Sequence, residues 1–247
     1  MDGTLKSRLE ELRQKLAAAS EGRYAPPRII AVTKTHTAEE ILPLLSLGQF
    51  EIGENRVQEL MEKLPALHAG APENEKFQIH LIGQLQTNKV KYIINDVCCI
   101  QSVDRLSLAR EIDRRAQAAG RVMPVLLQLS PAGEPQKCGA AKEELLPLLR
   151  EVSRMPGICV RGLMAVMPIA DPSPEGQAWL EGLFAETRAL FEHIREIAPE
   201  GVRMEELSMG MSGDYLLAAR HGATAVRIGS ALFGPRHYPE KDGAANR

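Results

Sequence analysis

The sequence is poor in cysteine, and its cysteines follow the spacing of neither a disulfide framework nor a zinc site. Of the four cysteines in 247 residues, Cys98 and Cys99 are adjacent, whereas Cys138 and Cys159 are isolated. Because no C-x-x-C or paired Cys/His spacing occurs, we expect reduced thiols and no structural zinc. Reduced thiols are typical of cytoplasmic proteins, so we expect this location.

An excess of one charge and a long apolar segment are also missing. The formal net charge of −2 provides no basic field for nucleic acid or for an anionic membrane. The N-terminus continues from Met1-Asp2-Gly3 with alternating charges instead of the apolar core of a signal peptide, and no run is long enough to cross a bilayer. We therefore expect neither nucleic acid nor a membrane as a partner.

Short apolar stretches of β type alternate with segments of helical periodicity along the chain. With 44% hydrophobic residues, the chain can build one large α/β domain or two small ones. The expected strands are 28–34, 50–54, 77–83, 97–103, 123–129, 158–166, 206–210 and 225–229. The expected helices include 4–19, 37–48, 87–95, 105–119, 142–154, 213–220 and one that has Pro174 in its first turn and ends near Ile197.

Strict alternation of strands and helices predicts a parallel sheet with right-handed crossovers. Eight units without a composition break favour closure into a single (β/α)8 barrel of the TIM type, preceded by an extra N-terminal helix. An open Rossmann-like sheet is the alternative, although no G-x-G-x-x-G opens the first helix. We expect one domain over residues 1–247, with the N-terminal helix within 1–24 and a flexible tail at 235–247.

Lys34 closes the first apolar run and is a candidate for forming a Schiff base. An amine at the mouth of a barrel is partly desolvated, which lowers its preference for the charged form and makes it a better nucleophile. A solvated or ion-paired lysine is the other interpretation of this residue.

Glycines and serines follow the last two expected strands. These loops are Ser208-Met209-Gly210-Met211-Ser212-Gly213 and Val226-Arg227-Ile228-Gly229-Ser230. Glycine lets the backbone approach an anion, and the N–H groups at two helix starts would point the same way, which predicts a phosphate site at its common place in barrels. Ordinary turn and cap residues would give the same pattern for either loop alone.

A lysine after the first strand and a phosphate site after the last two would face the same barrel mouth. Pyridoxal 5'-phosphate (PLP) has an aldehyde and a phosphate that fit this pair. Arg227 shares a strand face with Gly229, so it can point toward the ring nitrogen of such a ligand. An internal salt bridge is the alternative role for Arg227.

Several stretches resemble the pyridoxal phosphate homeostasis proteins (the YggS-like or PROSC family), whose fold resembles the barrel domain of alanine racemase, the PLP fold type III. The matching stretches span nearly the whole chain, and they are Ala31-Val32-Thr33-Lys34, 52–59 (IGENRVQE), 80–89 (HLIGQLQTNK), Arg161-Gly162-Leu163-Met164, 207–214 (LSMGMSGD) and 226–234 (VRIGSALFG).

The resemblance implies a role for each of eight residues. Lys34 would form the internal aldimine with PLP. Ser212, Gly229 and Ser230 would hold the phosphate, and Arg227 would face the pyridine nitrogen. Asn55 would lie beside the ring, with His80 and Met164 lining the pocket below it. A hydrogen-bonded core histidine and a simple packing methionine are the alternatives for the last two.

Two positions depart from the family pattern. Arg56 stands where the family usually has tyrosine, and Gln128-Leu129-Ser130 replaces a strand end that usually contains asparagine, although Lys137-Cys138-Gly139 keeps the family's Lys-x-Gly. These departures leave PLP binding intact but bear on any second ligand near the loops after the second and fifth strands. The sequence leaves open whether Lys89 or Lys137 holds a second PLP. Cys138 is interpreted as a spectator thiol, with a reactive thiol beside Lys137 as the alternative.

The residues favour a binding protein over an enzyme. An arginine opposite the ring nitrogen keeps that nitrogen unprotonated and weakens the electron sink. Racemases also use a tyrosine from an additional domain, and this chain ends thirteen residues after Gly234, so we expect that domain to be absent. We therefore expect a monomeric protein without turnover that holds PLP and passes it to apo-enzymes. An amino-acid racemase and a barrel enzyme for another phosphorylated ligand are the alternatives.

Overall fold

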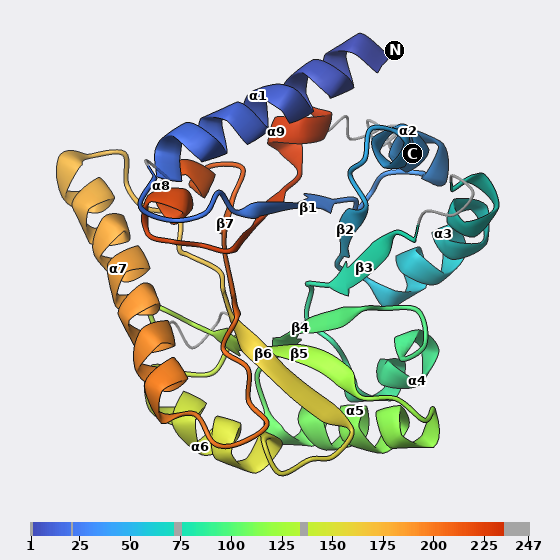
Figure 1. Ribbon diagram of the computed structural model, residues 1–247, viewed down its shortest axis with the longest axis vertical. Coiled ribbons are helices and arrows are strands. Elements are labelled where there is room, and N and C mark those ends of the chain that lie inside the picture. Colours follow the sequence, from blue (N-terminus) through green and yellow to red (C-terminus); the bar gives the residue numbers. More distant parts are fainter. Residues whose placement is uncertain (1, 21, 72–75, 134–137, 235–247) are drawn as a thin grey trace, which may run out of the picture.

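Eight parallel strands close into a barrel in the computed structural model, which describes residues 2–20, 22–71, 76–133 and 138–234. Each strand pairs with the next in sequence order, and the last pairs with the first (Figure 1). The strands are β1 (Arg28–Val32), β2 (Glu51–Glu54), β3 (Gln78–Leu81), β4 (Cys99–Val103), β5 (Met123–Leu129), β6 (Ile158–Ala165), β7 (Glu206–Met211) and β8 (Ala225–Ile228). The predicted (β/α)8 barrel is thus confirmed, and the open sheet is wrong.

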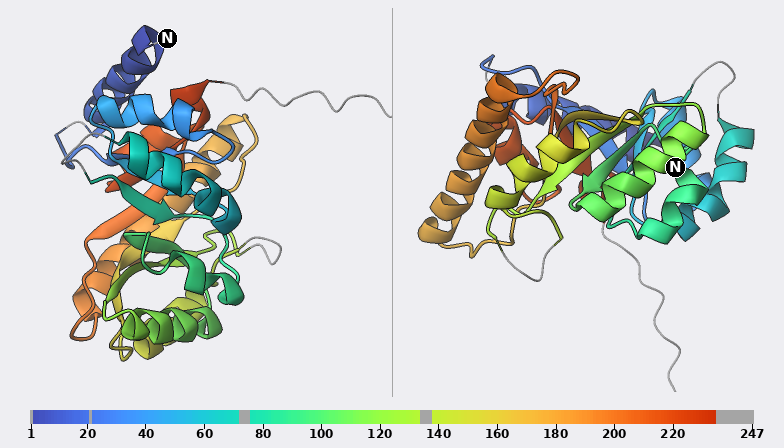
Figure 2. Two further views of the ribbon diagram at one scale, coloured as in Figure 1. Left: turned by 90° about the vertical axis from the view of Figure 1, so that its right-hand side faces the viewer. Right: turned by 90° about the horizontal axis from the view of Figure 1, so that it is seen from below.

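Helices follow the strands and lie outside them, as Figure 2 shows from two further sides. They are α2 (Ala38–Ser46), α3 (Val57–Gly70), the 3-10 turn η1 (Thr87–Lys89), α4 (Val90–Ile93), α5 (Leu106–Ala118), α6 (Lys142–Val152), α7 (Pro174–Ile197), α8 (Tyr215–Arg220) and α9 (Ser230–Phe233). The N-terminal helix α1 (Asp2–Ser20) packs against α8 and α9. No helix within these ranges is both long and apolar enough to pass through a lipid bilayer.

Local signals in the sequence explain several helix starts. The backbone N–H of Thr37 donates to the Glu40 carboxylate at 2.8 Å, which completes the capping box expected there. Ser173 accepts from the N–H of Gly176 ahead of Pro174 at the start of α7. The expected helix at 87–95 is instead a 3-10 turn followed by one turn of α-helix, because the Lys89 N–H bonds back to Gln86, three residues away.

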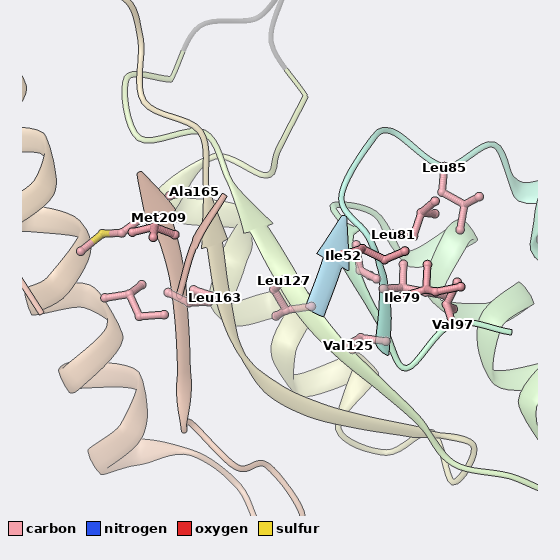
Figure 3. Packing of buried hydrophobic residues seen from close by; sticks show 14 of the residues in the cluster. Ile52, Ile79, Leu81, Leu85, Val97, Val125, Leu127, Leu163, Ala165 and Met209 are labelled. Carbon is pink, nitrogen blue, oxygen red and sulfur yellow. The ribbon is translucent and has the colours of Figure 1, made fainter. Parts of the chain in front are cut away.

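Two apolar layers hold the barrel together. Outward-facing strand residues such as Ile52, Leu81 and Leu163 pack against the surrounding helices in one continuous cluster (Figure 3). Inside the barrel, a small separate cluster is formed by Cys99, Leu126 and Met164. The alternation of side chains along each strand separates these two layers. The small inner cluster leaves room in the barrel for polar side chains.

A bulge in β6 depends on one glycine. Val125 of β5 pairs with Val160, but the next residue, Leu126, pairs with Gly162, so Arg161 is an extra residue on β6. Gly162 has a φ of +153°, and a Cβ there would lie 1.8 Å from the carbonyl oxygen of Glu206 in β7. A side chain at this position would therefore force β6 and β7 apart.

We predict that Gly162→Ala lowers the free energy of unfolding by at least about 2 kcal/mol, because it adds both backbone strain and a backbone clash. Urea denaturation measures this change. Gly182→Ala in α7 is the matched control, since nothing lies within 4 Å of its added Cβ, and it should gain about 0.5–1 kcal/mol from helix propensity. Equal unfolding midpoints for the two variants would contradict the explanation.

Candidate functional site

Five of the eight expected site residues lie at the C-terminal rim of the barrel. Asn55, Ser212 and Gly229 are the first residues after β2, β7 and β8, Ser230 begins α9, and Lys34 lies two residues beyond β1. Because β7, β8, β1 and β2 are neighbours in the closed sheet, these positions share one arc of the rim. His80, Met164 and Arg227 lie within their strands, deeper in the barrel.

Lys34 lies in a tight turn beyond β1, and its predicted place at the end of the first strand is wrong. The N–H of Thr33 still donates to the Gly53 carbonyl at 3.0 Å, as in the sheet, and the N–H of His36 then donates back to the Thr33 carbonyl at 3.1 Å. Thr35 has a φ of +68°, which ends the extended conformation. Lys34 is half-buried, and the Thr33 side chain faces outward, toward α3.

The loops after β7 and β8 are joined through Ser212. Its hydroxyl oxygen accepts hydrogen bonds from the backbone N–H groups of Gly229 at 3.2 Å and Ala231 at 3.3 Å. Two N–H donors at the start of α9 therefore converge on one oxygen, which is the arrangement that also suits a phosphate oxygen. Ser230, beside them, is exposed.

Gly210 and Asp214 fix the backbone on either side of Ser212. Gly210 has a φ of +92°, and a Cβ there would lie 2.4 Å from the Ala218 side chain, so only glycine lets β7 pass this close to α8. Asp214 accepts from the Met211 N–H at 2.5 Å. Burial raises the pKa of the Asp214 carboxyl, and the hydrogen bond and the nearby Arg227 oppose that rise.

Arg227 is almost completely buried in the barrel, and its hydrogen-bond partners are neutral. One terminal nitrogen donates to the Ser208 hydroxyl and the other to the Ala165 carbonyl, both at 2.8 Å. Burial lowers the pKa of Arg227 to about 10, partly opposed by Asp214, so the guanidinium remains charged at neutral pH. No carboxylate contacts it among the described residues, which argues against the internal salt bridge considered from the sequence.

Three further hydrogen-bonding groups extend from Arg227 down the barrel. The Ser208 hydroxyl donates to the Gln101 side-chain oxygen at 2.8 Å, and the Gln101 amide lies 3.1 Å from Nδ1 of His80. Since the amide nitrogen can only donate, Nδ1 of His80 is the unprotonated ring nitrogen. The other ring nitrogen, Nε2, lies 3.4 Å from the carboxylate of Glu51. Glu51 begins β2, so this contact lies toward the N-terminal end of the barrel, away from the rim. His80 is thus buried in a polar chain that reaches Arg227.

Asn55 and Met164 have contrasting surroundings. The side-chain oxygen of Asn55 is buried without a hydrogen-bond partner in the described structure, and an unpaired acceptor of this kind is costly unless a ligand satisfies it. The carbonyl of Asn55 is closely packed, because a Cβ on Gly83 would lie 2.3 Å from it. Met164 is fully buried in the inner apolar cluster below the rim.

Two groups of residues around the site have roles that the sequence did not predict. Ser208, which the sequence placed in the phosphate loop, instead lies within β7 and accepts from Arg227, and Gln101 accepts from Ser208; the polarity of Gln101 in an otherwise apolar, buried strand was its signal. Lys63, Glu54 and Glu59 form a partly buried charged cluster beside the Lys34 turn. In the sequence, this cluster looks like an ordinary ion pair on a helix surface.

Comparison with known proteins shows the family to which the chain is similar. A family model described as the N-terminal domain of alanine racemase matches residues 5–237. A pyridoxal phosphate homeostasis protein of Pasteurella multocida is 33% identical over 239 residues, covering 95% of this chain and 99% of its own length. One of Deinococcus radiodurans is 41% identical over 219 residues, with 88% and 94% covered.

Solved structures extend the comparison. PipY of Synechococcus elongatus, determined with PLP bound, is 34% identical with a TM-score of 0.80, and the match covers 93% of this chain and 100% of PipY. An alanine racemase of Clostridium difficile is 16% identical with a TM-score of 0.69 over 97% of this chain and 58% of its own, a likeness of fold alone. The chain therefore belongs to the alanine racemase N-terminal domain family, and within it to the pyridoxal phosphate homeostasis proteins.

Proposed function

We propose that this protein binds PLP reversibly through a Schiff base on Lys34 and takes part in the supply and homeostasis of PLP in the cell. The observation that carries the proposal is the meeting of a half-buried lysine after β1 with the Ser212 loop at one rim of the barrel. An amine and a set of phosphate donors at one mouth suit a ligand with an aldehyde and a phosphate. PipY, which shares the fold over its whole length, has been determined with PLP bound.

Individual contacts support the fit of this ligand. The unpaired Asn55 oxygen offers an acceptor at the rim, and the N–H groups that converge on Ser212 offer donors for a phosphate. Ser212, after β7, would hold the phosphate together with Gly229 and Ser230, which follow β8. His80 and Met164, both buried below the rim, would form the floor of the pocket. His80 is linked to Arg227 by hydrogen bonds through Gln101 and Ser208.

Arg227 supports binding without turnover. A guanidinium that stays charged at neutral pH and faces a pyridine nitrogen disfavours protonation of that nitrogen, because like charges repel. An unprotonated ring withdraws electrons weakly, which slows the carbanion chemistry of most PLP enzymes. The direct hydrogen-bond acceptors of Arg227, Ser208 and Ala165, are neutral, and the nearby Asp214 carboxyl opposes the positive charge only in part.

Partners and location follow as further proposals. The recipients would be apo-enzymes that require PLP, and the protein would work as a monomer. All four cysteines carry free thiols, which suits the reducing cytoplasm. Whether PLP released by this protein restores activity to an apo-enzyme tests the first of these, and sedimentation analysis tests the second.

The covalent link is tested by the visible spectrum. We predict that the wild type with PLP shows a yellow aldimine band and that borohydride fixes the ligand to Lys34, as peptide mass spectrometry would show. Lys34→Ala should lose the band, because no amine remains to condense with the aldehyde. Lys142→Ala, at an exposed ion pair with Glu186, is the control and should keep it.

Two outcomes would contradict the proposal. A colourless wild type in the presence of PLP would indicate a site for another phosphorylated ligand. Loss of optical activity of an amino acid, abolished in Lys34→Ala, would instead indicate a racemase.

The phosphate contact is tested by comparing PLP with pyridoxal, which lacks the phosphate. Ser212→Ala should weaken PLP binding about tenfold or more, the usual effect of losing a hydrogen bond to a charged group. Its affinity for pyridoxal should stay close to that of the wild type, as should both affinities in Ser107→Ala, an exposed position on α5. Equal losses for both ligands in Ser212→Ala would mean that Ser212 supports the loop rather than the phosphate.

A further inference from the structure

A second lysine, Lys63 of α3, lies largely buried beside the turn that carries Lys34. Its ammonium donates to the Thr33 carbonyl at 2.8 Å, to the Glu54 carboxylate at 2.9 Å and to the Glu59 carboxylate at 2.7 Å. An ammonium has three hydrogens, so these contacts use its full donor capacity. Its side chain is only 9% exposed, which distinguishes it from an ordinary surface ion pair.

The same cluster holds the backbone on both sides of Lys34. The carbonyl of Thr33, on one side, accepts from Lys63, and the N–H of Thr35, on the other side, donates to Glu59. The Thr33 hydroxyl also donates to Glu54 at 2.6 Å. The two residues that flank Lys34 are therefore tied to α3 and to the end of β2.

The turn between these anchors has an unfavourable conformation. Thr35 has a φ of +68°, which is rare for a β-branched residue and persists only where its surroundings impose it. The hydrogen bond from the Thr35 N–H to Glu59 is such a constraint, and Lys63 holds Glu59 in place. The conformation at Lys34 thus depends on contacts outside the turn.

We propose that Lys63 and Glu59 are positioning residues that hold the turn so that the amine of Lys34 is directed at the aldehyde of the ligand. This inference rests on the function proposed above for Lys34. Neither residue would touch PLP, because both reach from α3 to the backbone beside Lys34, Lys63 to Thr33 and Glu59 to Thr35. They would act on the covalent step and leave phosphate binding alone.

This division gives a readout that separates positioning from general structural support. PLP can form the Schiff base, in which the Lys34 nitrogen replaces the aldehyde oxygen and water leaves, whereas pyridoxine 5'-phosphate has the same ring and phosphate but no aldehyde. Loss of positioning should weaken PLP binding and leave pyridoxine 5'-phosphate binding unchanged. A general disturbance of the barrel mouth would weaken both.

The decisive variants are Glu59→Ala and Glu59→Gln, with both affinities measured by equilibrium titration. Glu59→Ala removes the acceptor of the Thr35 N–H, and we expect about tenfold weaker PLP binding with unchanged pyridoxine 5'-phosphate binding. Glu59→Gln keeps a side-chain oxygen that can accept, so it should restore most of the PLP affinity.

Lys63 is tested together with Glu54. Lys63→Met alone would leave the buried Glu54 without its cation and risks unfolding the protein. The double variant Glu54→Gln/Lys63→Met removes both charges and should show the same selective loss of PLP affinity. Lys15→Met is the matched control, because Lys15 pairs with Glu11 at 2.7 Å with the same helical spacing as Lys63 and Glu59, but on the exposed face of α1.

Each result decides one of the two proposals. Wild-type PLP affinity in Glu59→Ala, or an equal loss for both ligands, would overturn the positioning role. Lys34→Ala, titrated in the same way, should bind PLP no better than it binds pyridoxine 5'-phosphate. If Lys34→Ala kept the full PLP affinity, the proposed Schiff base itself would be wrong, whatever the Glu59 variants did.

Discussion

The pairing of β8 with β1 is the constraint on which the site depends. Arg28 pairs with Ala225 and Ala31 with Ile228, which joins segments almost two hundred residues apart. Without this closure, the lysine after β1 and the loop after β8 would lie at opposite edges of an open sheet. The apolar packing between strands and helices stabilises the closed form, and the polar rim follows from it.

The interior of the barrel holds both the small apolar cluster around Met164 and the chain of hydrogen-bonded polar side chains that begins at Arg227. Arg227 is held by Ser208 and Ala165, and Ser208 in turn bonds to Gln101. A buried charge whose hydrogen-bond partners are neutral acts strongly on groups placed nearby, and here the Asp214 carboxyl opposes it only in part. The interior of the barrel thus contributes to the electrostatics of the rim as well as to stability.

Much of the fold could be predicted from the sequence because its signals are local. The strand Met123–Leu129 was predicted with its observed bounds, and Thr37 and Pro174 marked helix starts that the structure confirms. The predictions were wrong where distant contacts decide the backbone. The first strand ends at Val32, before Lys34, because Glu59 and Lys63 hold the turn that follows it.

The sequence by itself determined the alternation of strands and helices and the motifs that carry the family resemblance, since periodicity and motif spacing are properties of the chain alone. It favoured a closed barrel over an open sheet, but the closure itself is a tertiary contact between β8 and β1. Only the tertiary structure decided that Arg227 bonds to neutral groups, that His80 joins the chain leading to it, and that Lys63 ties α3 to the turn at Lys34. These contacts join residues far apart in sequence, and their partners are fixed only when the barrel closes and brings the strand ends together.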